Sequence, residues 1–336
     1  MAPESTLTRN HIYKALSVMP YDRAGKCTIR PYRAFYLARN LLYQEGIEVS
    51  PQDVNRPVLL LAGTSLPLED RIEFILATAN AGYEVASIEN ALGGLFDVTI
   101  DPVKERPDAL RHFLGHLVET AQVEDITILA QSYSAFEVIR VLLEDPARYR
   151  RHIRSILFIN PPGLNENTGI VKHSTRFVGH HVLKGYLKAR RKLKELSESG
   201  LAESMKKRSA EIDFYRTEIN GINIWSRRTF VNPARTMREL YDVVSFRIRD
   251  HLATLQDEFG YDLNFFLQSD DQLLPVEISL QTLTGLVPSE KIRVVPGGHN
   301  DLFFQKWQRK ALLDFIGEIR SRTGLNSISL HGSDSL

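Results

Sequence analysis

The chain carries six short runs of apolar residues, and longer amphipathic stretches separate most of them. Each run is rich in Val, Ile, Leu and Phe and is closed by Gly, Pro, Asn or Asp, as buried strands are. The runs occupy residues 57–65, 83–90, 126–132, 155–163, 263–271 and 292–300. Strands that are apolar throughout and alternate with helices favour a parallel sheet with helices on both faces. The sequence therefore predicts an α/β protein with a mostly parallel, doubly wound sheet, and the first 50 residues leave room for one or two antiparallel leading strands.

One long interval breaks this alternation. Residues 164–260 show helix-type patterns and no convincing strand. Pro233 fits the first position of one helix, and Gly260 closes that segment. A second helix is indicated by an apolar stripe through Leu183, Tyr186, Leu187, Leu193 and Leu196. We therefore expect a first core segment at 1–163, a helical cap at 164–260 and a second core segment at 261–336.

Composition limits the classes of function that the chain can have. Its 336 residues carry a formal net charge of +1, which gives no overall case for a nucleic acid or a membrane surface as partner. Cys27 is the only cysteine, so an internal disulfide and a cysteine-based metal site are excluded and a reducing compartment is favoured. A membrane helix needs about 18 consecutive apolar residues, and the sequence offers no such run. We expect a cytoplasmic protein.

A serine lies where the run 126–132 passes into a helical pattern. A strand that turns into a helix within a few residues holds the residue at the bend in a strained conformation, with its side chain exposed above the sheet edge. The residues two positions away on either side must then be small, and Ala130 and Ser134 flank Ser132. Ser132 is thus a candidate nucleophile. The alternative is a plain strand-to-helix turn whose serine caps the helix.

A candidate base and a candidate acid follow, each beyond the end of a predicted strand. His299 follows two glycines after one strand, and Asp270 and Asp271 follow another. A serine nucleophile needs a base to take its proton, and the base needs a carboxylate to orient it. Isolated histidines and loop acids are usually solvated side chains. Their occurrence in the order Ser, Asp, His at the ends of parallel strands points to one shared site.

These residues resemble the pattern of the α/β-hydrolase fold, over roughly residues 57–320. The resemblance implies that Ser132 is the nucleophile and His299 the base. Asp271, which opens the segment DQLLP, matches the acid, and Asp270 is the reserve acid. The helical interval stands where this family commonly carries an inserted cap. No cofactor and no metal are implied.

The resemblance also implies an oxyanion hole. Its donors would be the backbone N–H of Tyr133 and an N–H at Thr64 or Ser65. The chain departs from the family at two places. Ala62 and Gly63 stand where the family usually has His-Gly, and the elbow lacks both glycines of Gly-x-Ser-x-Gly.

The function that the resemblance implies is that of a serine hydrolase, which cleaves a carboxylic ester or thioester through an acyl-enzyme. The alternatives are a triad-bearing C–C hydrolase, lyase or acyltransferase, and a non-catalytic ligand-binding protein on the same fold. The expected partner is a small molecule, with no nucleic acid and no membrane involved. Basic residues outnumber acidic ones between Lys172 and Arg208, which favours an anionic or carrier-bound substrate unless this helix face is merely solvated.

Overall fold

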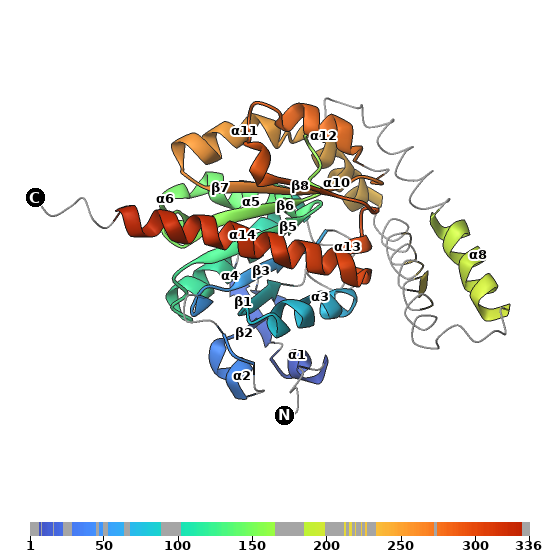
Figure 1. Cartoon of the computed structure of the whole chain (residues 1–336), viewed down its shortest axis with the longest axis horizontal. Coiled ribbons are helices and arrows are strands. Elements are labelled where there is room, and N and C mark those ends of the chain that lie inside the picture. Colours follow the sequence, from blue (N-terminus) through green and yellow to red (C-terminus); the bar gives the residue numbers. More distant parts are fainter. Residues whose placement is uncertain are drawn as a thin grey trace, which may run out of the picture.

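An eight-stranded sheet organises the part of the chain that the structure describes (Figure 1). The computed structural model describes residues 7, 9–15, 17–22, 29–44, 47–49, 53–63, 68–88, 102–164, 185–198, 233–271 and 274–330, with a few helical positions between 212 and 226. The strand order is β1-β2-β4-β3-β5-β6-β7-β8. The strands are β1 (Ser17–Asp22), β2 (Ile29–Leu37), β3 (Val58–Leu61), β4 (Val85–Ile88), β5 (Ile126–Gln131), β6 (Ile153–Ile159), β7 (Asp262–Gln268) and β8 (Ile292–Val295).

The pairing of the strands agrees with the predicted class. β1 pairs with β2, and β2 with β4, in antiparallel register. The remaining pairs, from β4 through β3 to β8, are all parallel. The mostly parallel sheet and the antiparallel leading strands are therefore confirmed.

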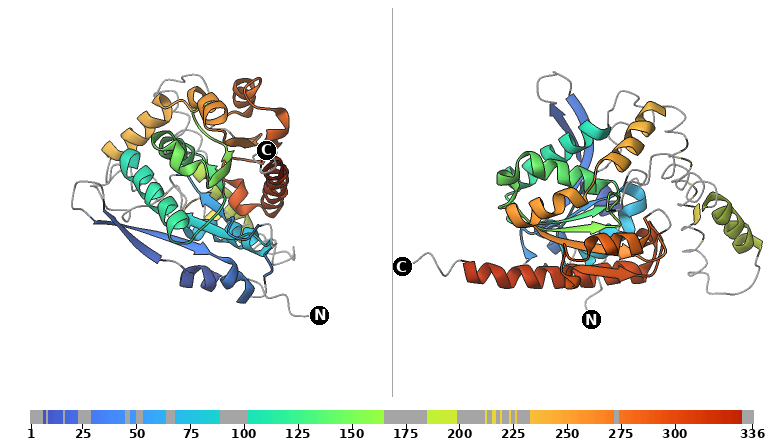
Figure 2. Two further views of the ribbon diagram at one scale, coloured as in Figure 1. Left: turned by 90° about the vertical axis from the view of Figure 1, so that its left-hand side faces the viewer. Right: turned by 90° about the horizontal axis from the view of Figure 1, so that it is seen from above.

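Helices cover both faces of the sheet. The helices of the described residues are α1 (Arg9–Ala15), α2 (Arg39–Gln44), α3 (Leu68–Asn80), α4 (Pro102–Glu119), α5 (Ser134–Glu144), α6 (Pro146–Tyr149), α8 (Gly185–Glu198), α10 (Pro233–Ser245), α11 (Arg249–Ala253), α12 (Val276–Leu283), α13 (Asp301–Phe304) and α14 (Lys306–Leu330), and α8 stands apart from the sheet (Figure 1). Short π and 3-10 helices lie at Thr254–Glu258 and Ser289–Lys291. Figure 2 shows α4 and α5 on one side of the sheet and α14 on the other.

The buried core is accordingly divided in two. Side chains alternate across a strand, so Leu59 and Leu61 of β3 join the core under α4 and α5, whereas Val58 and Leu60 join the core under α3 and α14. All four are completely buried. This is the packing of a doubly wound sheet, and it explains why the strands are apolar throughout.

Between β6 and β7 the described elements are all helical. α10 begins at Pro233 as predicted, but it stops at Ser245, and α11 and a π-helical turn follow before Gly260, whose φ of +70° ends the segment. The predicted stripe on α8 is wrong at Leu187, which is 58% exposed. Within the described residues no helix is long and apolar enough to cross a bilayer. The division into core and cap segments stays a prediction.

Candidate active site

Ser132 occupies a tight bend between β5 and α5. Its φ is +56°, in the left-handed region that costs a non-glycine residue about 1–2 kcal/mol. The Ser132 N–H donates to the carbonyl of Ile159 (2.9 Å), which ties the bend to the end of β6. The Ser134 hydroxyl has two carbonyl acceptors for its proton, that of Gln131 at 2.8 Å and that of Leu61 at 3.0 Å. A serine is therefore accommodated where the family usually has glycine, because its hydroxyl has acceptors in this buried position.

Gly63 lies directly against the bend. A Cβ at this position would stand 3.0 Å from both Ser132 Cβ and Gln131 Oε1, and 3.4 Å from Ser132 Oγ. Any side chain here would push against the serine. The glycine of the loop after β3 is thus required by its distance to Ser132, although the residue before it is alanine.

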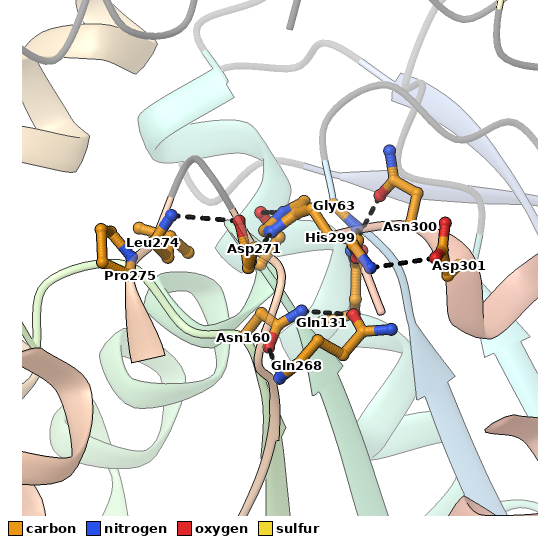
Figure 3. Close-up of polar contacts among 12 residues, drawn as sticks. Gly63, Gln131, Asn160, Gln268, Asp271, Leu274, Pro275, His299, Asn300 and Asp301 are labelled. Atoms are coloured by element: carbon orange, nitrogen blue, oxygen red, sulfur yellow. Dashed lines mark hydrogen bonds and ion pairs between the residues drawn. The ribbon is translucent and has the colours of Figure 1, made fainter. Parts of the chain in front are cut away.

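The structure brings Ser132, His299 and Asp271 together. His299 Nε2 lies 2.9 Å from Ser132 Oγ. His299 Nδ1 lies 2.6 Å from Asp271 Oδ2 (Figure 3). The Asp271 side chain is fully buried and that of His299 is 10% exposed. The other carboxylate oxygen of Asp271 accepts the N–H of Leu274 (3.0 Å), so the carboxylate is held in one orientation. A hydrogen-bonded chain from carboxylate through imidazole to hydroxyl is the arrangement that makes a serine nucleophilic.

Asp270 has a different position. Its Oδ2 accepts the N–H of Gly297 (3.0 Å), and the Ser269 hydroxyl donates to its Oδ1 (3.2 Å). The carboxylate therefore holds the backbone of the loop that carries His299. The structure places Asp271, and not the reserve acid, at the imidazole.

The predicted oxyanion donors are described only in part. Tyr133 stands at the N-cap of α5, next to Ser132. The first N–H groups of a helix have no acceptor within the helix, so this position leaves an N–H for a ligand. Thr64 and Ser65 lie outside the described residues.

Gln131 is a site residue that the sequence analysis missed. Its side chain is buried directly before Ser132, and its Oε1 accepts the N–H of Gly63 (2.6 Å). Its Nε2 donates to Asn300 Oδ1 (3.2 Å) and lies 3.5 Å from the His299 carbonyl (Figure 3). One amide thus connects the loop after β3, the serine bend and the histidine loop. The sequence signal that could have identified Gln131 is its position, as a polar residue at the end of an otherwise apolar strand.

A chain of buried amide side chains supports the loops that carry Asp271 and His299. The Asn160 side chain donates to Gln268 Oε1 (2.5 Å) and accepts the Gln268 N–H (2.9 Å). Gln268 donates in turn to Gln308 Oε1 (2.5 Å), and Gln308 donates to the Pro296 carbonyl (2.8 Å). All three amide side chains are buried. They join the carboxyl ends of β6, β7 and β8, and a fully satisfied buried network of this kind favours one arrangement of the loops.

Comparison with known proteins identifies the fold. No family model and no curated protein matches the sequence. A bromoperoxidase from Bacillus anthracis is 16% identical with a TM-score of 0.53, over 90% of this chain and all of the other. A thermophilic esterase from Thermogutta terrifontis is 11% identical with a TM-score of 0.55, over 90% and 99%. A serine hydrolase from Cycloclasticus zankles is 10% identical with a TM-score of 0.52, over 90% and 99%.

Identities this low show the fold alone. The chain has the α/β-hydrolase fold, as the resemblance of its motifs implied. Within the described residues, no group of three or more His, Cys, Asp or Glu side chains could hold a metal ion.

Proposed function

We propose that the protein is a serine hydrolase that cleaves a carboxylic ester or thioester. The observation that carries this proposal is the chain of contacts from Asp271 through His299 to Ser132, with the serine at a strained bend. A serine that only capped a helix would need neither the imidazole 2.9 Å away nor a buried carboxylate behind the ring. Ser132 is the nucleophile, His299 the general base and Asp271 the orienting acid.

The roles give a two-step reaction. His299 Nε2 takes the hydroxyl proton while Ser132 Oγ attacks the carbonyl carbon, and Asp271 stabilises the imidazolium that forms. The backbone N–H of Tyr133 and one from the loop after Gly63, at Thr64 or Ser65, hold the developing oxyanion. When the tetrahedral intermediate collapses, the imidazolium gives its proton to the departing alcohol or thiol, and an acyl-enzyme remains. His299 then takes a proton from water as the water oxygen attacks the acyl carbon. The bond from that carbon to Ser132 Oγ breaks, His299 returns the proton to Oγ, and the acid leaves.

The charge of the inserted helices favours an anionic or carrier-bound substrate. Lys188, Arg190 and Arg191 of α8 are all exposed, and the surrounding segment is rich in lysine and arginine. Exposed cationic side chains attract anionic substrates through long-range fields that salt screens. We therefore expect kcat/KM for a carboxylate-bearing ester to fall with added salt, and that for a neutral ester of equal length to stay constant. The cytoplasmic location stays a prediction, on the basis of the single cysteine.

Hydrolysis of short-chain p-nitrophenyl esters by wild type and Ser132→Ala tests the proposal. We expect wild-type turnover, and a loss on the order of 10⁴–10⁶ in kcat for the variant. Equal rates for the two proteins would contradict it. A wild type that reacts with serine-directed reagents but hydrolyses neither esters nor thioesters would point to the C–C hydrolase, lyase or acyltransferase alternative. A wild type inert in both assays would be a ligand-binding protein on this fold.

A further inference from the structure

A cluster of side chains connects the serine bend to α10. Tyr133 is 3% exposed, and its phenol donates to Asp242 Oδ2 of α10 (2.6 Å). Arg140 lies two helical turns after Tyr133, on the same face of α5, and donates to both carboxylate oxygens of Asp242, at 2.7 Å to Oδ2. We call Tyr133, Arg140 and Asp242 the Asp242 cluster. A buried carboxylate is stable only when it is paired, so both donors hold it in place.

The ring of Tyr133 is also fixed on its faces. The Arg106 guanidinium lies 4.9 Å above the ring, and Arg106 is itself paired with Glu137 (2.5 Å), with both side chains nearly fully buried. The Phe136 ring packs edge-on at 5.4 Å. Burial and the nearby Asp242 raise the pKa of the Tyr133 phenol, so it stays a hydrogen-bond donor over the whole neutral range. The phenol therefore has one well-defined position.

That position matters because Tyr133 carries the N–H next to the nucleophile. Ser132 is held at φ +56°, and strained backbone persists only where the surroundings fix it. Relaxation of Ser132 would displace the Tyr133 Cα and turn its N–H. A ring anchored at its hydroxyl and on its faces opposes this movement.

We propose that Asp242 is a positioning residue of the active site: acting through the Tyr133 phenol, it holds the Tyr133 N–H where an oxyanion forms. This inference rests on the proposed function. It also gives α10 a role in catalysis, because this helix of the inserted segment then supports the oxyanion donor directly. Movement of α10 away from α5 would lower the rate of the chemical step.

Tyr133→Phe tests the inference, because it removes only the hydroxyl and leaves Arg140 paired with Asp242. We expect kcat to fall about 10- to 100-fold, less than the loss of a whole oxyanion donor, with KM nearly unchanged. The inhibition constant of a boronic acid, whose serine adduct places an oxygen at the oxyanion position, should rise by a similar factor. Rates are expressed per site titrated with a fluorophosphonate, so that misfolded protein does not count.

Tyr149→Phe is the matched control. The Tyr149 hydroxyl is also buried, and it has no hydrogen-bond partner among the described residues, so its removal should leave kcat unchanged. Asp242→Ala should lower kcat as Tyr133→Phe does, and the double variant should be no slower than the slower single one. Asp242→Asn keeps an oxygen that can accept the phenol proton, so its kcat should lie between those of Asp242→Ala and wild type. It replaces Asp242→Ala in the test if the alanine variant does not fold.

Wild-type kcat in Tyr133→Phe, or strictly additive losses in the double variant, would overturn the inference while leaving the proposed function intact. Activity per milligram of protein that falls only in proportion to the number of titrated sites, with kcat per site unchanged, would show a purely structural role and would also overturn it. A wild type with no titratable site would instead refute the proposed function, and the inference with it.

Discussion

His299 Nε2 lies 2.9 Å from Ser132 Oγ, although 167 positions separate the two residues in the chain. Ser132 follows β5 and His299 follows β8, and β6 and β7 lie between these strands in the sheet. The side chains meet because the four strands are parallel and their carboxyl ends share one edge. The geometry of the site therefore depends on the short loops at this edge, where single side chains hold one loop against the next.

The two adjacent acids should respond differently to the same change. Asp271→Asn removes the carboxylate that orients His299 and should lower kcat by about 10³–10⁴. Asp270→Asn keeps an oxygen that can accept the Gly297 N–H, so kcat should fall by at most about tenfold, the equivalent of one hydrogen bond. Steady-state hydrolysis of one ester by both variants makes the comparison. A larger loss for Asp270→Asn would mean that the acid is assigned to the wrong residue.

The contacts of Gln131 predict a role in both stability and turnover. Gln131→Leu removes the acceptor of the Gly63 N–H and the donor to Asn300, which should cost about 1–3 kcal/mol in the free energy of unfolding. We expect kcat to fall as well, because the loop after β3 and the histidine loop lose their common contact. Gln131→Glu keeps the acceptor for Gly63 and should retain more activity. Wild-type kcat in Gln131→Leu would show that this amide does not position the site.

The three side chains that meet at the serine bend were the predictable part of the site. Ser132, Asp271 and His299 each stand just beyond an apolar strand, and the carboxyl ends of parallel strands meet whatever the details of packing. The choice of Asp271 over Asp270 followed from the segment DQLLP and agrees with the observed contact to His299.

The supporting contacts were not predictable in the same way. Gln131 and Gln268 also end apolar strands, but the sequence does not say which loop a buried amide will face, because that depends on the register of neighbouring strands. Helical periodicity likewise predicts which apolar residues share one face of a helix, but it does not predict which element, if any, covers that face. It placed Leu187 on a buried stripe, whereas the structure leaves this side chain mostly exposed.

Two glycines with positive φ offer a matched test of the histidine loop. At Gly297, with φ +128°, a Cβ would lie 1.7 Å from Gln308 Nε2, the group that donates to the Pro296 carbonyl. At Gly285, with φ +83°, a Cβ would meet no heavy atom of the described residues within 4 Å, apart from its chain neighbours. Gly285→Ala carries the left-handed backbone cost of about 1–2 kcal/mol. Gly297→Ala should lose about 1–3 kcal/mol more, because its φ is less accessible still to a residue with a Cβ and because the Cβ overpacks against Gln308. Urea unfolding measures both, and equal losses would contradict the crowding at Gly297.

The raised pKa of the Tyr133 phenol predicts a pH dependence of stability. The folded state keeps this proton above pH 10, where an unfolded tyrosine releases it, so the residue's contribution is complete below about pH 10 and is lost as pH rises further. Above about pH 10, the free energy of unfolding should fall more steeply in wild type than in Tyr133→Phe, by a difference that approaches about 1.4 kcal/mol per pH unit. Urea titrations between about pH 9 and 11.5 measure this slope. Identical slopes would mean that the phenol is not held by its burial and by Asp242.

The most direct test of the central claim is covalent labelling of Ser132 by a fluorophosphonate, followed by intact-mass and peptide analysis. A serine activated by His299 should take up one phosphonyl group per chain, on the peptide that contains Ser132, and His299→Ala should react far more slowly. Absence of labelling in folded wild-type protein, or labelling that is equally fast in His299→Ala, would contradict the account.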